Sequence, residues 1–432
     1  MREFLGAAFR SFSGRLLGAA SALVASYAVT SNLSVADSGL FFLSLGFTIF
    51  FSHVLRFGLD SLVMKRCAIC LSEGDRRGFL TIVSASVLIC LAGSALLYAG
   101  VYVSGLAVRY EYLDYLLLAY PAAILTALLG IVGHSLHSSG YVFVGAATNL
   151  ALHYVLFTLY VYVFGPSDAS GFIRTLIAAC GSAFAVQSAI ALFAYAKRGI
   201  GPSEWRGLGT LGLDYREIFG TTLPFWIIVI AQQLNQWSSQ FISSVHVGER
   251  DLALLAIAAR LALLVPMILT AVNMVVSPRF AAHHHRGESD KTEHVLADSL
   301  KVLSAVSLLV FLVMVAFGDD VLHVFGEQYV EAAGLLFVLV CGQLINSLTG
   351  PCGKLLMMSG FEKDVRNSSV VVALLALPVT FYLAARHGVY GAAVSTALTI
   401  SVQNLVLAWT VHRRLDMNLL SIYFGFFRRA GA

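Results

Sequence analysis

The sequence FLTIVSASVLICLAGSALLYAGVYVS runs from Phe79 to Ser104 and contains no charged side chain. A helix needs about 20 mostly apolar residues to cross the roughly 30 Å hydrocarbon core of a bilayer. This stretch is long enough to do so, and two arginines, Arg76 and Arg77, stand just before it. It therefore predicts a transmembrane helix.

The rest of the chain has the same character. Of its 432 residues, 58% are hydrophobic and only 12% are charged, whereas a soluble chain carries roughly 25% charged residues. Lipid must therefore solvate most of the surface, and we predict an all-α polytopic membrane protein with about 12 transmembrane helices. The predicted spans are Ser13–Ser31, Gly39–Phe57, Phe79–Ser104, Tyr115–Gly133, Val142–Gly165, Gly171–Tyr195, Thr221–Val245, Leu252–Ser277, Leu300–Phe317, Ala332–Gly350, Ser368–Ala385 and Gly391–Thr410.

Positive charges alternate between the loops that join these spans. Of the 28 lysines and arginines, 23 fall in one set of loops and adjoining span ends, which includes both termini. Because cytoplasmic loops are enriched in Lys and Arg, both termini are predicted to be cytoplasmic, in a bacterial inner membrane. The arginines before the first span are interpreted as the lead-in to an uncleaved helix.

The chain also repeats itself. LHSSGY at Leu136–Tyr141 resembles LMMSGF at Leu356–Phe361, and the end of the sixth span at Val186–Arg198 resembles the end of the twelfth at Val402–Arg414. Both pairs have nearly the same spacing, so they predict two parallel six-helix repeats. We predict an N-terminal lobe at residues 1–198, a cytoplasmic linker at 199–220 and a C-terminal lobe at 221–432.

The seventh predicted span is the most polar. Gln232, Gln236 and Gln240 recur at helical spacing, with Asn235 close by. Two interpretations fit, because buried amides need partners that lipid does not supply. The amides either line a water-filled cavity and bind sugar hydroxyls, or they join this helix to its neighbours. The length of the stripe favours the cavity.

Two arginines occupy unusual places. Arg260 lies inside the eighth predicted span, where a charge costs about 3 kcal/mol and normally faces a cavity or a partner. Its planar, multi-donor guanidinium suits a pyrophosphate, although an ion pair would explain it equally. Arg56 ends the second span, with His53 and Asp60 nearby. It either pairs with Asp60 or serves as a gate or pyrophosphate contact.

The remaining candidates are weaker. His153, within the fifth span, is a possible substrate contact, although a satisfied histidine in the helix bundle is the commoner case. All 24 carboxylates lie in loops or at span ends, which weakens a cation-coupled mechanism. The six cysteines read as small buried hydrophobes. The sequence predicts no catalytic residue, no metal site, no cofactor and no nucleic-acid partner.

Several stretches resemble a known family. They are VLHVFGEQYVEAA from Val321, LVCGQLINSLTGPCG from Leu339, MSGFE from Met358, FGLDS from Phe57 and HGVYGAA from His387. They are similar to polysaccharide (O-antigen type) flippases of the multidrug/oligosaccharidyl-lipid/polysaccharide exporter superfamily. The resemblance implies two six-helix lobes around a partly cationic cavity that works by alternating access.

The resemblance also implies a substrate. It would be an undecaprenyl-pyrophosphate-linked oligosaccharide, moved from the cytoplasmic to the periplasmic leaflet by a monomeric transport unit. Membrane lipids and a polysaccharide polymerase machinery are the other expected partners. Two alternatives stay open at this stage. One is a cation-coupled multidrug exporter of the same fold, and the other is a membrane glycan ligase or polymerase, for which the outward loops are short.

Overall fold

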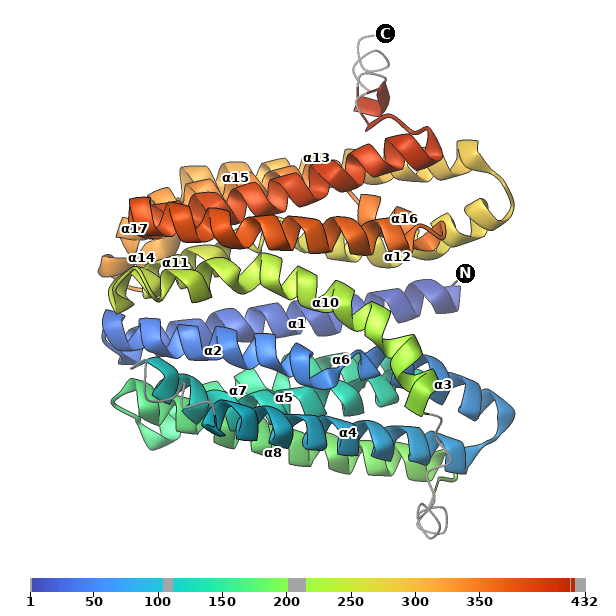
Figure 1. Ribbon diagram of the computed structural model, residues 1–432, viewed down its shortest axis with the longest axis horizontal. Helices are drawn as coiled ribbons and strands as arrows, with labels where there is room; N and C mark the ends of the chain where they lie inside the picture. The colour runs from blue at the N-terminus through green and yellow to red at the C-terminus, as the bar shows by residue number, and fades with distance from the viewer. Residues whose placement is uncertain (1, 104–111, 201–214, 420, 424–432) are drawn as a thin grey trace. The chain divides into compact units, whose positions relative to one another are not determined.

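The computed structural model describes residues 2–103, 112–200, 215–419 and 421–423. All regular elements in these ranges are helices, as Figure 1 shows. The chain divides into two compact units, Met1–Ile230 and Ala231–Ala432. Most of the predicted linker, residues 201–214, lies outside the described residues. The predicted all-helical, multi-pass architecture is confirmed.

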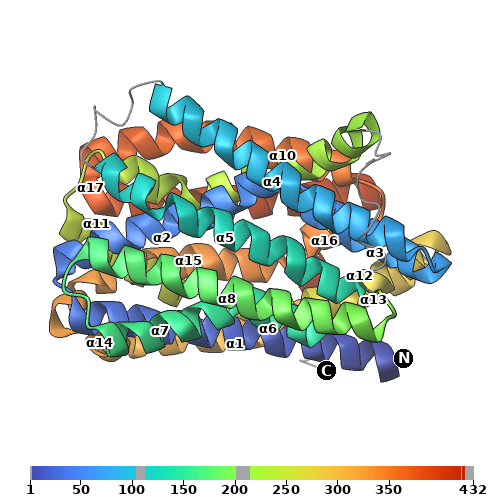
Figure 2. The same ribbon diagram turned by 90° about the horizontal axis from the view of Figure 1, so that it is seen from below.

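The first unit is built around one central helix. Helix α5 (Tyr112–Ser138) packs against α2, α3, α4, α6 and α8, and Figure 2 shows α5 and α8 lying alongside each other. The helices around it are α1 (Arg2–Asn32), α2 (Val35–Arg56), α3 (Leu59–Glu73), α4 (Arg76–Val103), α6 (Val142–Leu150), α7 (Leu152–Phe164) and α8 (Ala169–Lys197).

Local sequence explains where several of these helices begin and end. The Ser34 hydroxyl accepts a hydrogen bond from the Asp37 N–H and caps α2, and the Asp168 carboxylate caps α8 in the same way through Gly171. Such caps satisfy N–H groups that have no partner within the helix. Gly165 ends α7 with a positive φ of 55°, a conformation that favours glycine.

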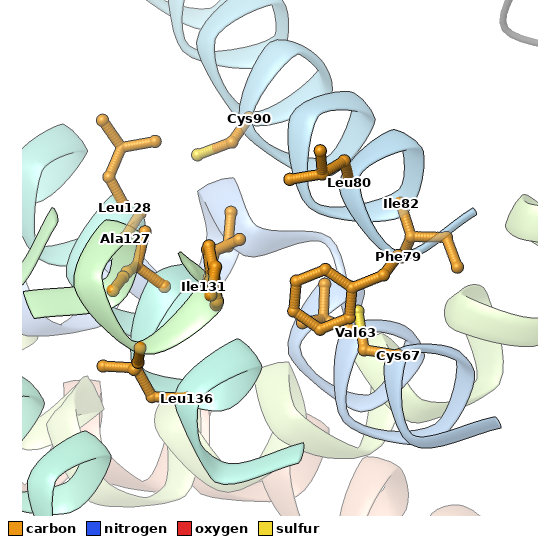
Figure 3. Packing of buried hydrophobic residues seen from close by; sticks show 14 of the residues in the cluster. Val63, Cys67, Phe79, Leu80, Ile82, Cys90, Ala127, Leu128, Ile131 and Leu136 are labelled. Atoms are coloured by element: carbon orange, nitrogen blue, oxygen red, sulfur yellow. The ribbon is translucent and has the colours of Figure 1, made fainter. Parts of the chain in front are cut away.

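The core of the first unit lies where α3, α4 and α5 meet. In Figure 3, Phe79 and Leu80 of α4 pack with Val63 and Cys67 of α3 and Ile131 of α5. These side chains are all buried. All six cysteines are free, and all but the half-buried Cys341 are buried, so the prediction that they act as small hydrophobes is confirmed.

The second unit combines several long helices with the short elements α14, η2 and α16. A second core joins α12, α13, α16 and α17 around Phe280, Leu296, Leu355 and Val411. The elements are α11 (Glu249–Ala262), α12 (Met267–His285), α13 (Ser289–Ala316), α14 (Gly318–His323), η2 (Glu327–Ala332), α15 (Ala333–Thr349), α16 (Cys352–Met358) and α17 (Glu362–Leu415). Helix α10 (Tyr215–Ser243) begins in the first unit and ends in the second.

Helix α17 is a hairpin of two antiparallel arms. Gly388 has φ 57° and ψ −138°, which no helical residue adopts. Across this bend Thr380 and Ser395 hydroxyls lie 2.5 Å apart, and the Arg414 Nε donates to Asp364 Oδ2 at 2.9 Å. Figure 1 shows the orange-red and red arms side by side. The arms therefore correspond to the predicted spans Ser368–Ala385 and Gly391–Thr410.

The number of membrane spans depends on whether the two arms of α17 are counted as one helix or as two. Within the described residues nine helices are long and apolar enough to cross a membrane, or ten when α11 and α12 count as one bent span. That count takes α17 once and leaves out α10, whose amides lower its hydropathy. The twelve predicted spans are reached by counting the arms of α17 separately and adding α10.

The eighth predicted span, Leu252–Ser277, is not continuous. Helix α11 ends at Ala262, α12 begins at Met267, and the two are bent by 42°. Pro266 stands in the break and explains it, because proline lacks an N–H and disfavours a helical conformation in the residue before it. A hydrophobicity pattern cannot reveal such a break, since both pieces are equally apolar.

The internal repeat has a structural counterpart. The buried Gln187 of α8 donates from its amide to the Thr148 hydroxyl at 2.9 Å. Gln403, its match in the second half of the sequence, donates to the Ser369 hydroxyl at 3.3 Å. The first glutamine thus joins α8 to α6, and the second joins the two arms of α17.

Candidate functional site

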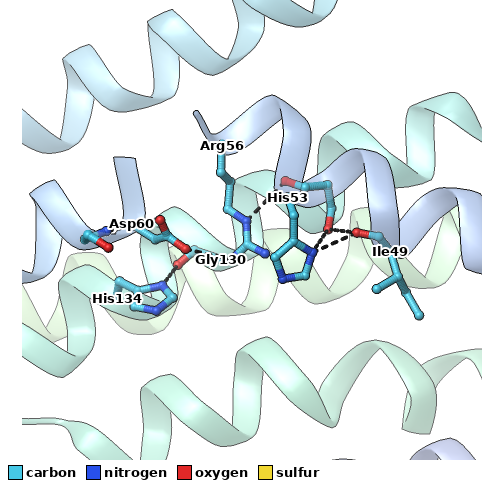
Figure 4. A network of polar contacts seen from close by, with 8 residues as sticks. Ile49, His53, Arg56, Asp60, Gly130 and His134 are labelled. Atoms are coloured by element: carbon cyan, nitrogen blue, oxygen red, sulfur yellow. Dashed lines mark hydrogen bonds and ion pairs between the residues drawn. The ribbon is translucent and has the colours of Figure 1, made fainter. Parts of the chain in front are cut away.

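Arg56 is the most deeply buried charge among the predicted site residues, with 7% of its surface exposed. It is the last residue of α2, and its Nε donates to the Ser52 carbonyl at 3.1 Å. Its Nη1 lies 3.6 Å from Asp60 Oδ2, as Figure 4 shows. On the α5 side the guanidinium lies against Gly130, where a Cβ would come within 2.6 Å of Nη1.

A sharp turn between α2 and α3 brings Arg56 and Asp60 together. Phe57 (φ 50°) and Gly58 (φ 72°) are both in the left-handed region, so α2 stops and α3 starts at Leu59. A bulky residue such as Phe57 rarely adopts this conformation unless its surroundings hold it there. Asp60 then lies in the first turn of α3, where a carboxylate suits the positive end of the helix dipole.

Two histidines line the same cluster. His53 Nδ1 lies 2.9 Å from the Ile49 carbonyl, and His134 Nδ1 lies 2.7 Å from the Gly130 carbonyl. A carbonyl oxygen only accepts, so each Nδ1 carries a hydrogen and donates it. We define the Arg56 cluster as His53, Arg56, Asp60 and His134.

The Arg56–Asp60 pair leaves donors of the guanidinium open. Burial by itself would raise the pKa of Asp60, but Arg56 and then His134 outweigh burial and lower it. Asp60 is therefore ionised, yet the 3.6 Å separation is longer than a hydrogen bond. Among the described residues Arg56 thus has one hydrogen-bond acceptor, the Ser52 carbonyl, for its five N–H groups. Such a group retains the capacity to bind an anion.

We expect Asp60→Asn and Arg56→Gln to respond differently to an anionic ligand. Asp60→Asn leaves the guanidinium buried without its counter-charge, so its melting temperature should fall. Millimolar inorganic pyrophosphate should then raise that melting temperature more than it raises the wild type's, and should leave Arg56→Gln unchanged. Thermal unfolding by intrinsic fluorescence measures these shifts. Equal, pyrophosphate-independent losses in both variants would instead show a purely structural ion pair.

The amide stripe on α10 divides into two parts. Gln232 and Gln236 are exposed in the structure, and Asn235 is half-buried with no hydrogen-bond partner for Oδ1 among the described residues. Gln240 is buried, and the neighbouring Ser239 hydroxyl accepts from Thr396 of α17 at 2.6 Å. Ser239, beside the buried end of the stripe, therefore joins α10 to α17 within the second unit, and Gln240 Nε2 has no hydrogen-bond partner among the described residues. The first two glutamines are exposed and remain available for other groups.

Arg260 lies at the broken helix of the second unit. It occupies the last turn of α11, immediately before the break, and is half-buried. The negative end of a helix dipole stabilises a cation at this position. Discontinuous helices are a recurrent feature of transporter binding sites, because their free ends present charge inside the membrane. Sequence alone placed Arg260 within a span, but the helix end was not expected.

His153 does not join the Arg56 cluster. It is buried in the first turn of α7, its ring lies 4.1 Å from that of Tyr154, and its Nδ1 has no hydrogen-bond partner among the described residues. Sequence reasoning did not connect two residues of α5 with Arg56. They are His134, which belongs to the cluster, and Gly130, which lies against the guanidinium. Their spacing of one helical turn on α5 was the available signal, but only the fold brings that turn beside Arg56.

Comparisons with known proteins agree with this architecture. Residues 228–382 match the sequence profile of the MatE family. A curated relative from Haloferax volcanii, named probable low-salt glycan biosynthesis flippase Agl15, is 23% identical over 169 residues. The match covers 39% of this chain and 35% of that protein, so it spans about a third of the relative's length.

Solved structures share the fold over nearly the whole chain. An inward-facing multidrug resistance MATE family transporter of the MOP superfamily has a TM-score of 0.71 at 15% identity, covering 92% of this chain and 94% of that chain. A MOP superfamily transporter from Pyrococcus furiosus, described by a binding pocket of reverse polarity that suggests a different function, has a TM-score of 0.65 at 14% identity, covering 96% and 95%.

At these identities the solved structures establish the fold, and the profile match is a similarity over residues 228–382. No group of three or more potential metal ligands occurs within the described residues. Taken together, residues 228–382 resemble the MatE family, and the described helices share the multi-pass fold of solved MATE transporters.

Proposed function

We propose that this transporter flips a lipid-linked oligosaccharide, carried on undecaprenyl pyrophosphate, from the cytoplasmic leaflet to the opposite leaflet by alternating access. The observation that carries the proposal is the buried Arg56, whose guanidinium has open donors and only a long contact to Asp60. A planar, multi-donor cation of this kind suits a pyrophosphate better than it suits a cationic drug.

The other proposed contacts fall into two groups, one for the pyrophosphate and one for the sugars. Arg260, at the end of α11, is the second cation for the pyrophosphate. Gln232 and Gln236 are exposed on α10, and Asn235 has an unsatisfied Oδ1; these amides suit sugar hydroxyls. Gln240 and His153 are buried, each within its own unit, and complete the set of proposed substrate contacts. The proposal needs no cofactor and no chemical step.

Further support comes from the relative in Haloferax volcanii, which is named a probable glycan biosynthesis flippase. We also propose, from the distribution of lysines and arginines, that both termini are in the cytoplasm. The transport unit in this proposal is a monomer in a bacterial inner membrane, which delivers its substrate to a polysaccharide polymerase.

The test is reconstitution into vesicles that contain a fluorescent undecaprenyl-pyrophosphate-linked saccharide in both leaflets. A reagent that cannot cross the membrane quenches the outer leaflet, and the protein should then let the remaining signal decay. We expect Arg260→Ala to slow this decay about tenfold, the effect of losing roughly 1.4 kcal/mol of interaction, at unchanged protein yield. The same rate in empty and protein-containing vesicles would overturn the flippase proposal.

A second candidate function is cation-coupled drug export, because a solved multidrug transporter shares the fold. Such a transporter needs an ionisable group that exchanges its proton during transport. Among the described residues of the first unit one candidate is Asp60, a half-buried carboxylate that Arg56 neutralises. Drug export predicts that vesicles with an imposed pH gradient accumulate a cationic dye, and that Asp60→Asn abolishes this accumulation. The flippase proposal predicts no dye accumulation.

A further inference from the structure

Arg56 and Asp60 stand on either side of the turn between α2 and α3, and a further helix, α10, packs against this turn. The first part of α10, which belongs to the first unit, lies directly against it. The Trp226 indole N–H donates to the Val54 carbonyl at 3.0 Å. The Trp226 ring also stacks on Phe57, with 4.4 Å between centroids and 13° between planes. One side chain thus contacts the turn in two ways.

The backbone of α10 is equally close to this turn. A Cβ at Gly58 would lie 2.6 Å from the Thr222 carbonyl oxygen and 3.3 Å from the Trp226 nitrogen. Gly58 also has a positive φ of 72°, so two independent constraints exclude a larger residue there. The turn and α10 therefore fit each other at backbone distance.

We propose that Trp226 is a positioning residue that holds the end of α2 and thereby sets the place of Arg56. This inference rests on the proposed role of Arg56 in substrate binding. Val54 and Phe57 flank Arg56 within two residues on either side, and Trp226 contacts both. The Val54 carbonyl also accepts the Phe57 N–H at 3.2 Å. Trp226 thus stabilises the left-handed conformation of Phe57 from which α3 departs toward Asp60.

The positioning role has a physical reason. Phe57 is strained in the left-handed region, and its conformation persists only when neighbouring groups hold it. Gly130 limits the guanidinium on the α5 side, and Trp226 limits the backbone on the α10 side. Without Trp226, the turn can relax and Arg56 loses its fixed place, although no contact of Arg56 itself has changed.

The experiment compares Trp226→Ala with Trp226→Phe and uses Trp237→Ala as a matched control. Trp237 is on the same helix, but its indole donates to Gln233 of that helix at 3.0 Å. The first readout needs no substrate. It is hydrogen–deuterium exchange of a peptide that spans residues 54–62, measured in nanodiscs. We expect Trp226→Ala to speed exchange at the turn about tenfold, and Trp237→Ala to leave it unchanged.

The second readout is a double-mutant cycle with Arg56→Gln in the vesicle assay. If Trp226 acts through Arg56, its removal should slow flipping in the wild-type background but have no further effect in Arg56→Gln, because interacting residues are not additive. Trp226→Phe retains an aromatic ring for stacking, so it should recover part of the rate.

The outcomes separate the positioning role of Trp226 from the proposed function of Arg56. Unchanged exchange at residues 54–62 in Trp226→Ala overturns it, whatever the protein transports. Additive losses in the cycle also overturn it, because Trp226 would then act independently of Arg56. A wild-type flipping rate in Arg56→Gln would instead remove Arg56 from the proposed function, and the exchange result would not be affected. Faster exchange combined with non-additive losses supports the proposal.

Discussion

Replacing Gly130 with alanine is expected to slow substrate transport about tenfold while the folded protein is recovered in normal yield. The added Cβ would lie 2.6 Å from Arg56 Nη1, 2.9 Å from Cδ and 3.1 Å from Cζ. These atoms belong to the outer part of a flexible side chain, so the guanidinium moves and the helices do not. A displacement of about 1 Å at a binding group lowers rates by up to about a hundredfold, so tenfold is a moderate expectation.

Gly181→Ala is the matched control for this substitution. It makes the same change in a helix of the same unit, but the nearest atom to its new Cβ is Leu125 Cδ1 at 3.8 Å, an ordinary contact. Vesicle transport and thermal unfolding should be measured for both variants. If Gly130→Ala transports at the rate of Gly181→Ala, the position of the Arg56 guanidinium does not control transport.

Replacing Gly391 with alanine should prevent the α17 hairpin from closing. A Cβ there would lie 1.9 Å from the Leu383 carbonyl oxygen and 2.4 Å from its carbonyl carbon. These are backbone atoms of the opposite arm, so the arms themselves must separate. That separation disturbs the contact between the Thr380 and Ser395 hydroxyls. Core disruptions of this kind lower the free energy of unfolding by roughly 3 kcal/mol or more. For a domain of about 200 residues, this loss lowers the melting temperature by about 6 °C or more.

The control for Gly391→Ala is Gly93→Ala in α4. No atom lies within 4 Å of a Cβ built at Gly93, and alanine favours a helix more than glycine does. This variant should therefore melt at or slightly above the wild-type temperature. Fluorescence-detected gel filtration and thermal unfolding in detergent compare the two. A wild-type profile for Gly391→Ala would show that the arms of α17 do not approach as closely as the hairpin requires.

The sequence predicted the membrane architecture because its signals are long and redundant. The apolar runs, the alternating positive charges and the matching segments at 136–141 and 356–361 all describe properties that extend over a whole helix or loop. The bend at Gly388 falls between two predicted spans, as expected, whereas the break at Pro266 was missed. That break depends on the conformation of a few residues, which a hydrophobicity average does not contain.

Arg56 shows how much of a single residue's surroundings sequence spacing can predict. Sequence spacing predicted that Arg56 and Asp60 could meet, because four residues bring two side chains to one face of a helix. They do meet, at 3.6 Å. The helix is nevertheless interrupted between them at Phe57 and Gly58, so their approach is set by a turn that spacing did not predict.

For this protein the sequence alone determined that lipid surrounds most of the folded chain. A chain with 12% charged residues and apolar stretches as long as Phe79–Ser104 folds as spanning helices in lipid, since a helix satisfies its backbone hydrogen bonds within its own segment. Only the tertiary structure decided what surrounds Arg56. Gly130, His134 and Trp226 lie far from it in the chain, and each owes its place beside the α2–α3 turn to helix packing. Such packing depends on how side chains from separate helices fill a shared space, which no local pattern encodes.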